Sequence, residues 1–167
     1  MENERYLELE NKDNRLFIKE CFIKDYCKQL EKYNIINDNR IDELEGIYLI
    51  TIDKATINQK SGWSEAIELL RKMNLELHYY IVYYDLRKRG RRVWKGIRES
   101  TLIAEMPNQR KLEVLILKEG NEINPIKIAN WSELAVADAH TPIVAIVDKN
   151  GEVTYYESRI FNNFASY

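Results

Sequence analysis

Few side chains in this chain have the types and spacing that catalysis requires. The 167 residues include two histidines, His78 and His140. His78 lies among aromatic residues in a predicted helix, so we expect it to pack. His140 lies at a predicted helix end, where a protonated imidazole interacts favourably with the helix dipole, so we expect a capping role. No serine or cysteine accompanies either histidine in a recognisable triad.

The other reactive residue types match no chemical motif. The sequence has neither a Walker loop nor a GxGxxG segment, and its carboxylates form no metal-nuclease pattern. Cys21 and Cys27 stand six residues apart without a Cys or His cluster nearby, so they do not indicate a zinc site. We expect them to be reduced thiols, since six residues is an awkward spacing for a bridge within one helix. No metal or cofactor is expected.

A run of positive charge between residues 86 and 98 is the clearest candidate for binding. We call this set the basic cluster: Arg87, Lys88, Arg89, Arg91, Arg92, Lys95 and Arg98. Because the whole chain has a formal net charge of −2, the cluster indicates a local site for an anionic partner. A solvated helix end and turn is an alternative explanation of the same charges.

The composition is that of a folded soluble domain. Hydrophobic residues make up 45% of the chain and charged residues 31%, which is enough apolar material for a core. No apolar stretch approaches the roughly 20 residues that a bilayer requires. The acidic N-terminus shows no signal-peptide pattern. We therefore expect a cytoplasmic protein that makes no membrane contact.

The patterning predicts an α/β (α+β) fold, with a change in composition near residue 75. In the first part, apolar residues between 16 and 33 follow helical spacing, residues 46–58 contain a partial strand, and Ser64 caps a helix. We expect an N-terminal domain over residues 1–75 and a second domain over residues 76–167.

The second domain is predicted to begin with a helix and continue mainly as strands. The helix covers residues 76–89 and ends at Gly90 after a cationic last turn. Strands are expected at 91–95, 101–106, 111–118, 142–148 and 152–158, with a hairpin turn between the last two. A further helix is expected over 131–140, capped by Asn130 or Ser132.

Two segments resemble sequence blocks of the tRNA-intron splicing endonucleases. Residues 83–96 read YYDLRKRGRRVWKG, and residues 143–157 read IVAIVDKNGEVTYYE. Both blocks occur in the order and at nearly the separation found in that family. The resemblance implies a small N-terminal helix and strand domain, then a catalytic-like domain whose mixed sheet is flanked by helices.

The resemblance also implies a reaction and the residues that perform it. The family cuts precursor tRNA at bulge-helix-bulge motifs without a metal, leaving 2′,3′-cyclic phosphate and 5′-hydroxyl ends. Its members use Tyr as base, His as acid and Lys as the transition-state cation. In this chain those positions fall at about Glu105, Lys111 and His140. Because a proton-transfer triad acts as a unit, we expect no cleavage by this chain alone.

The loss of all three residues suggests the non-catalytic structural subunit of an archaeal-type enzyme. The resemblance implies a heterotetramer with two catalytic subunits, in which terminal strands pair and an acidic turn docks into the partner. Residues placed in that contact are Asp148, Glu152, Tyr155, Tyr156, Ile160, Phe161 and Phe164. Some of the aromatic and apolar ones are equally expected as ordinary strand residues of the core.

Two other functions remain open at this point. The chain could be an active nuclease in which Glu105 and His140 replace the acid–base pair, although no cation would fill the Lys position. It could also be a stand-alone RNA-binding scaffold. The RNA-binding candidates are Arg87, Arg89, Arg91, Arg92, Lys95 and Arg98, of which Arg87 and Arg89 also belong to the fold motif.

Overall fold

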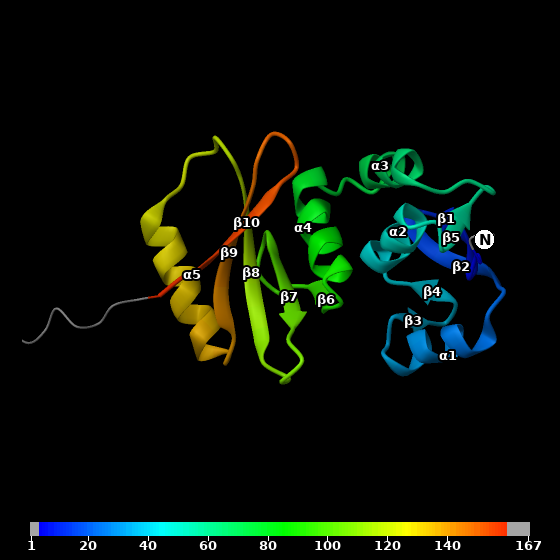
Figure 1. The fold of residues 1–167 in the computed structure, drawn as a ribbon, viewed down its shortest axis with the longest axis horizontal. Helices are drawn as coiled ribbons and strands as arrows, with labels where there is room; N and C mark the ends of the chain where they lie inside the picture. The colour runs from blue at the N-terminus through cyan, green and yellow to red at the C-terminus, as the bar shows by residue number, and fades with distance from the viewer. Residues whose placement is uncertain (1–3, 160–167) are drawn as a thin grey trace, which may run out of the picture. The chain divides into compact units, whose positions relative to one another are not determined.

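The computed structural model describes residues 4–159 and divides the chain after Leu77 into two compact units. The first unit contains β1 (Leu7–Lys12), β2 (Arg15–Cys21), α1 (Lys24–Lys32), β3 (Ile36–Asn37), β4 (Arg40–Ile41), α2 (Glu43–Thr51), β5 (Ala55–Ile57) and α3 (Trp63–Lys72). The second contains α4 (Leu77–Lys88), β6 (Arg92–Lys95), β7 (Thr101–Glu105), β8 (Lys111–Lys118), α5 (Pro125–Ala137), β9 (Thr141–Val147) and β10 (Val153–Glu157). This mixture of helices and mixed sheets confirms the predicted fold class (Figure 1).

In the first unit, helix α2 packs against a sheet with the strand order β3-β4-β2-β1-β5. A Cβ atom added to Gly46 of α2 would lie 2.7 Å from Leu16 Cδ1 and 3.3 Å from Ile41 Cγ2. The absence of a side chain at this position therefore lets α2 approach the sheet closely.

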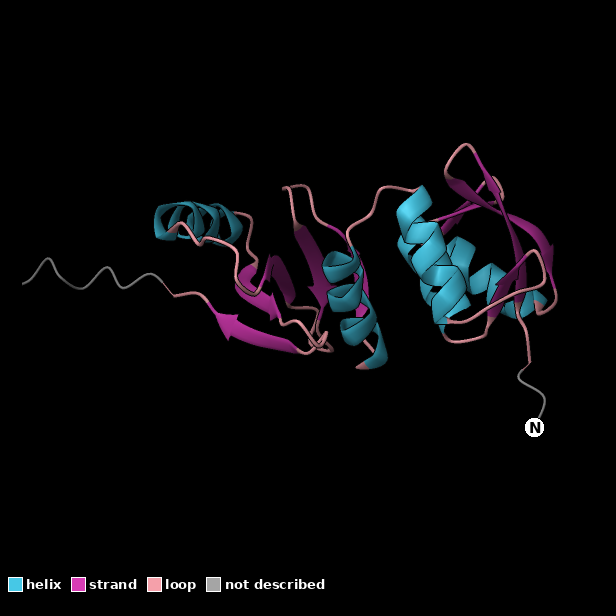
Figure 2. Cartoon of the chain, turned by 90° about the horizontal axis from the view of Figure 1, so that it is seen from above, coloured by secondary structure: helices cyan, strands magenta, loops and turns pink. Residues whose placement is uncertain are grey.

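In the second unit, the sheet has the order β10-β9-β8-β7-β6. Strands β8 and β9 are parallel and joined through α5, whereas the other neighbouring strands are antiparallel. Helices α4 and α5 cover opposite faces of this sheet (Figures 1 and 2). On the α5 face, Trp131 and Ala135 form a core cluster with Val144 of β9. On the α4 face, Tyr155 of β10 reaches Asp85 of α4.

The predicted helical spacing over residues 16–33 was wrong in its first half. Residues 15–21 form strand β2, which pairs with β1 through a turn at Asp13 and Asn14, and only residues 24–32 are helical. Asp13 and Asn14 have φ values of 52° and 58°. Two successive residues with positive φ favour a tight hairpin, and Asp-Asn is a turn signal that apolar spacing alone overlooks.

About half of the β-branched run at residues 46–58 is helix, because α2 extends to Thr51, and only Ala55–Ile57 form the predicted strand. Helix α2 is buried over all residues from Leu44 to Thr51, so burial on every side removes the amphipathic pattern by which a helix is recognised. Its cap is Asp42, whose side chain accepts a hydrogen bond from the Glu45 amide at 3.1 Å. Helix α3 likewise starts one residue before Ser64, after Gly62, so the Ser64 cap was wrong.

The prediction of reduced thiols is also corrected, because Cys21 and Cys27 form a disulfide. The spacing argument assumed a single helix. Cys21 instead ends strand β2 and Cys27 lies in helix α1, so the chain reverses between them and brings the two side chains together.

Most predicted elements of the second domain are confirmed to within one or two residues. Helix α4 ends before Gly90, whose φ of 75° suits a glycine stop. The exception is α5, which begins at Pro125 rather than near Trp131. The Asn124 side chain accepts hydrogen bonds from the amides of Ile126 and Lys127, at 3.0 and 3.3 Å. The Asn-Pro start signal of this helix had been missed.

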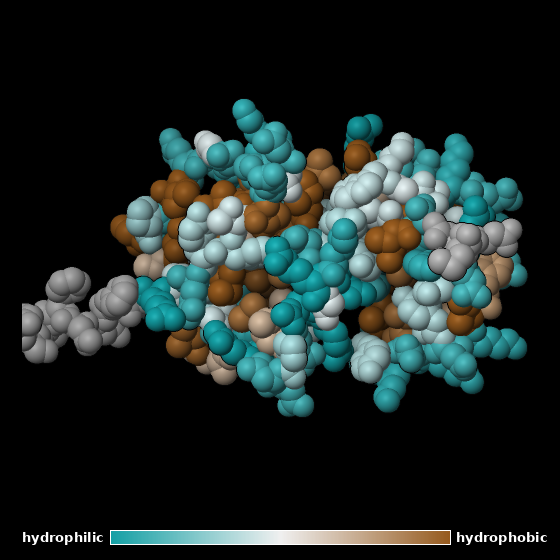
Figure 3. Space-filling model, in the orientation of Figure 1, coloured by the Kyte–Doolittle hydropathy of each residue, from teal (hydrophilic) through white to brown (hydrophobic). Residues whose placement is uncertain are grey.

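None of the helices between residues 4 and 159 has the length and hydropathy of a membrane span. Apolar side chains nevertheless reach the surface on and before α5, where Ile123, Ile126, Leu134 and Val136 are more than half exposed (Figure 3).

The loop between β6 and β7 depends on the absence of a side chain at Gly96. A Cβ atom there would lie within 3.0 Å of the Thr101 backbone carbon and closer still to the Thr101 side chain. We expect Gly96→Ala to lower the free energy of unfolding by about 2 kcal/mol, since overpacking of this kind forces a backbone shift. Urea unfolding measures the change. The neighbouring exposed substitution Lys95→Ala is the control and should stay within about 0.5 kcal/mol of the parent chain; equal effects would contradict the steric argument.

Candidate functional site

The three positions at which the resemblance places catalytic residues lie at one end of the second sheet. Glu105 ends β7 and is paired in register with Lys111, the first residue of β8. Leu112 is paired with Thr141, the first residue of β9, so His140 lies at the same end. We call this end of the sheet the strand-end site.

Glu105 and His140 are not assembled as an acid–base pair. The Glu105 carboxylate accepts a hydrogen bond from Arg92 Nη1 at 3.0 Å on the edge strand β6. His140 instead directs Nδ1 toward Glu113 Oε1 at 3.2 Å. With one strand between β7 and β9, the two backbones are separated by about 10 Å. Lys111 also points elsewhere, with Nζ 5.8 Å from the centroid of the Trp94 ring.

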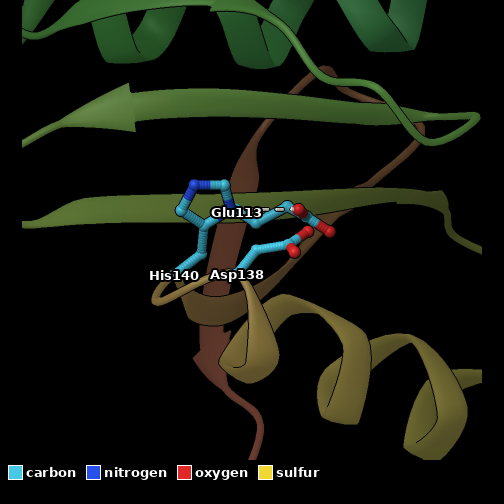
Figure 4. A group of neighbouring side chains, drawn as sticks. All are labelled: Glu113, Asp138 and His140. Carbon is cyan, nitrogen blue, oxygen red and sulfur yellow. Dashed lines mark hydrogen bonds and ion pairs between the residues drawn. The ribbon is translucent and has the colours of Figure 1, made fainter.

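The His140 partner, Glu113, is the centre of a buried charged network (Figure 4). Glu113 is 1% exposed and lies on the α5 face of β8. Its Oε1 forms an ion pair with Arg98 Nη1 at 2.6 Å, and its Oε2 accepts a hydrogen bond from Trp131 Nε1 at 2.5 Å. Arg98 Nη2 binds Asp138 Oδ2, also at 2.6 Å. Both carboxylate oxygens of the buried residue are therefore satisfied by the protein itself.

By spacing alone, Glu113, Asp138 and His140 could hold a metal ion, since one ligand atom of each lies within 4.8 Å of the others. The Arg98 guanidinium already bridges the two carboxylates, so an ion would have to displace it. The hydrogen bond to Asp138 raises the pKa of Arg98 further. This arginine supplies the cation that the carboxylates require, and we assign no metal to the group.

The sequence analysis identified Arg98 and His140 but missed Glu113, Asp138 and Trp131 as their partners. One signal was available: Glu113 interrupts an otherwise apolar strand, LEVLIL, at residues 112–117. A carboxylate in a buried strand must find a cation or several donors. Which residues would supply them depends on α5 and the loop before β7, and the sequence does not show that placement.

Most of the basic cluster is engaged in contacts within the second unit. Arg87 donates to the Arg91 carbonyl at 3.1 Å, and Arg89 Nε pairs with Asp85 Oδ2 at 2.8 Å. Arg92 and Arg98 form the ion pairs described above. Within residues 4–159, the Lys88, Arg91 and Lys95 side chains have no ion pair. Lys88 and Lys95 are also exposed, so these two lysines offer the charge best placed for an anionic partner.

Two of the candidate partner-binding residues, Asp148 and Glu152, lie in the turn between β9 and β10. Asp148 Oδ1 accepts hydrogen bonds from the amides of Asn150 and Glu152, at 2.8 and 2.9 Å, so Asp148 shapes the turn between β9 and β10. The Glu152 side chain is exposed and available to a partner. Ile160, Phe161 and Phe164 lie outside the described residues.

Tyr155 and Tyr156 point to opposite faces of β10. Tyr155 donates a hydrogen bond to Asp85 Oδ2 at 2.6 Å, and Arg89 lies over its ring. Burial, together with this hydrogen bond, raises the pKa of Tyr155. Tyr156 is 55% exposed on an edge strand, so of the two tyrosines it is the one a partner could cover.

Burial of Glu113 generates a stability prediction. Glu113→Gln retains the shape of the side chain but leaves Arg98 without its buried counter-charge, so we expect a loss of about 3 kcal/mol in unfolding free energy. Asp138→Asn removes the other partner of Arg98, which is exposed, and should cost less than about 1 kcal/mol. Chemical unfolding of both variants tests this, and an equal loss in the two would show that burial of Glu113 is not the deciding factor.

Comparison with protein families agrees with this architecture. Residues 76–155 match the catalytic C-terminal domain of the tRNA intron endonucleases. Residues 12–73 match the tRNA-intron endonuclease SEN2-like N-terminal domain. No curated protein matches the chain significantly. Together the two domain matches cover well over half of the sequence, with the N-terminal domain first and the catalytic domain after it. The chain therefore belongs to the tRNA-intron endonuclease family.

Proposed function

We propose that this chain is the structural, non-catalytic subunit of a heteromeric tRNA-intron splicing endonuclease. In this proposal it assembles as an archaeal-type heterotetramer, two plus two, with a catalytic subunit of the same family. The complex cleaves precursor tRNA at bulge-helix-bulge motifs in the cytoplasm. The family membership supports precursor tRNA as the substrate.

The strand-end site carries the proposal of a non-catalytic role. General acid–base catalysis needs groups that can reach a substrate and exchange protons with it. Here Glu105 is paired with Arg92, and His140 faces a Glu113 whose charge is already compensated by Arg98. None of the three positions holds the family residue, and two of them are committed to contacts within the fold.

One observation favours the alternative of a divergent active nuclease. Arg110 Nε donates a hydrogen bond to Thr141 Oγ1 at 2.8 Å, which brings a cation to the strand-end site beside His140. In this alternative, Arg110 supplies the cation that the sequence analysis did not find for the Lys position. A stand-alone RNA-binding scaffold is the third possibility, although most of the basic cluster is paired internally.

A reconstitution experiment separates the three functions. This chain and a triad-bearing family member are assayed on a bulge-helix-bulge RNA, each alone and then mixed. We expect cleavage at the intron ends to require the mixture or to increase strongly in it. A mixture containing a catalytic subunit without its active-site histidine is the control and should be inactive. Cleavage by this chain alone, lost on His140→Ala, would establish the divergent nuclease, and tight RNA binding without any effect on the partner would favour the scaffold.

The turn between β9 and β10 provides a prediction about assembly. We expect Glu152→Arg to slow association with the catalytic subunit by on the order of tenfold at low salt, since a charge at an interface mainly affects encounter and partner choice. Biolayer interferometry at two ionic strengths measures the rate. Lys149→Ala in the same turn is the matched control, and both variants should unfold at the parent midpoint. An unchanged association rate for Glu152→Arg would place the partner contact elsewhere.

A further inference from the structure

The N-terminal unit contains one covalent link between its sheet and a helix, outside the site described above. Cys21 is the last residue of β2, and Cys27 lies in α1. Their Cα atoms are 6.7 Å apart, within the range of about 4.4–6.8 Å that a disulfide spans. Cys21 is partly exposed, whereas Cys27 is buried at 9% exposure, so Cys21 is the more accessible of the two residues.

Apart from this bond, α1 is a short helix without a side-chain N-cap. The helix has 9 residues, and a helix of this length is marginal in water without packing. Its N-cap residue, Ile23, provides no side-chain hydrogen bond. Cys27 and Leu30 are its buried residues. Tyr26 adds a ring contact with Tyr6, at 4.7 Å between centroids.

Exposed aromatic residues flank this link. Phe22 lies between the two cysteines and is 50% exposed, and Tyr33 follows the helix and is 47% exposed. The disulfide closes a short loop that includes Phe22, so it restricts both the path of the chain and the position of this side chain. Opening of the bond therefore removes this restriction on residues 22–26.

We propose that the Cys21–Cys27 bond is a redox-sensitive clamp that holds α1 on the N-terminal sheet. A dithiol reductant opens it by thiol–disulfide exchange. One reductant thiolate attacks the sulfur of Cys21, the more exposed of the two residues, and Cys27 leaves as a thiolate and takes up a proton. The second reductant thiol then releases Cys21. Two electrons and two protons pass to the protein, which gains two thiols, while the dithiol becomes a disulfide.

Opening of the clamp is local. A reduced Cys27 behaves as a small apolar side chain and remains compatible with the core, so the rest of the unit has no reason to unfold. Helix α1 then loses its covalent tie to β2, and it opens more often. Backbone amides of residues 24–32 report these openings through hydrogen exchange, because local unfolding exposes them to solvent.

Hydrogen–deuterium exchange on the full chain tests the clamp. The oxidised protein, the protein reduced with dithiothreitol, and the variant Cys21→Ser are compared. Cys21→Ser is the sharpest variant, because it removes the bond without changing any residue of α1. We expect amides of 24–32 to exchange at least tenfold faster in the reduced protein and in Cys21→Ser. Exchange in β1 and in the second unit should stay unchanged, and the variant should not respond to dithiothreitol.

Three outcomes would overturn the proposal. Alkylation of the air-oxidised, denatured protein could reveal two free thiols, which would show that the bond does not form. Equal exchange in the oxidised and reduced proteins would show that the bond does not hold α1. Faster exchange throughout the N-terminal unit on reduction would show that the bond stabilises the whole unit rather than α1 alone. Lys28→Ser, an exposed substitution in the same helix, controls for the effect of a serine and should leave the response to dithiothreitol intact.

Discussion

Burial of a single carboxylate is the constraint around which the second unit is arranged. Glu113 lies in a strand whose neighbouring residues are apolar, and an unpaired charge there would cost several kcal/mol. Arg98 comes to it from the loop before β7, Trp131 from α5 and His140 from the residue just before β9. The network therefore links three separate segments of the chain to strand β8. It also explains why α5 packs where it does, since Trp131 serves both the apolar core and the carboxylate.

A second contact ties the two family-like blocks together on the opposite face. Tyr155 belongs to one block and Asp85 to the other, and the hydrogen bond between them joins β10 to α4. Arg89 completes the group by pairing with the same carboxylate oxygen. In the sequence, Tyr155 was a candidate for partner binding and Arg89 a candidate for RNA binding. In the folded chain their side chains bind Asp85 and hold β10 against α4. These motif residues therefore stabilise the fold rather than recognise a partner.

The strand-end site and the surfaces around it then show a division of roles. The positions that would perform acid–base chemistry are occupied by residues with contacts inside the fold. The features that face outward are the Glu152 carboxylate, the Tyr156 ring and the cations Lys88 and Lys95, which form no ion pair with any residue between 4 and 159. A chain with an internally satisfied centre and outward-facing contact residues suits assembly with a catalytic partner, which is the basis of the proposed function.

The sequence by itself predicted most helices and strands of the second domain to within one or two residues. Its strands alternate or are continuously apolar, and its turns carry Gly, Asn and Pro signals. It also determined the family resemblance and the absence of the Tyr, His and Lys residues, since residue identity needs no coordinates. Tertiary structure decided the rest. Helix α2 looked like a strand because burial on all sides hides helical periodicity, and the cysteines looked unpaired because their distance depends on a chain reversal. The partners of Glu113 were likewise beyond the sequence, because they converge from 15, 18 and 27 residues away, and only the folding of the sheet against α5 brings them within hydrogen-bond distance.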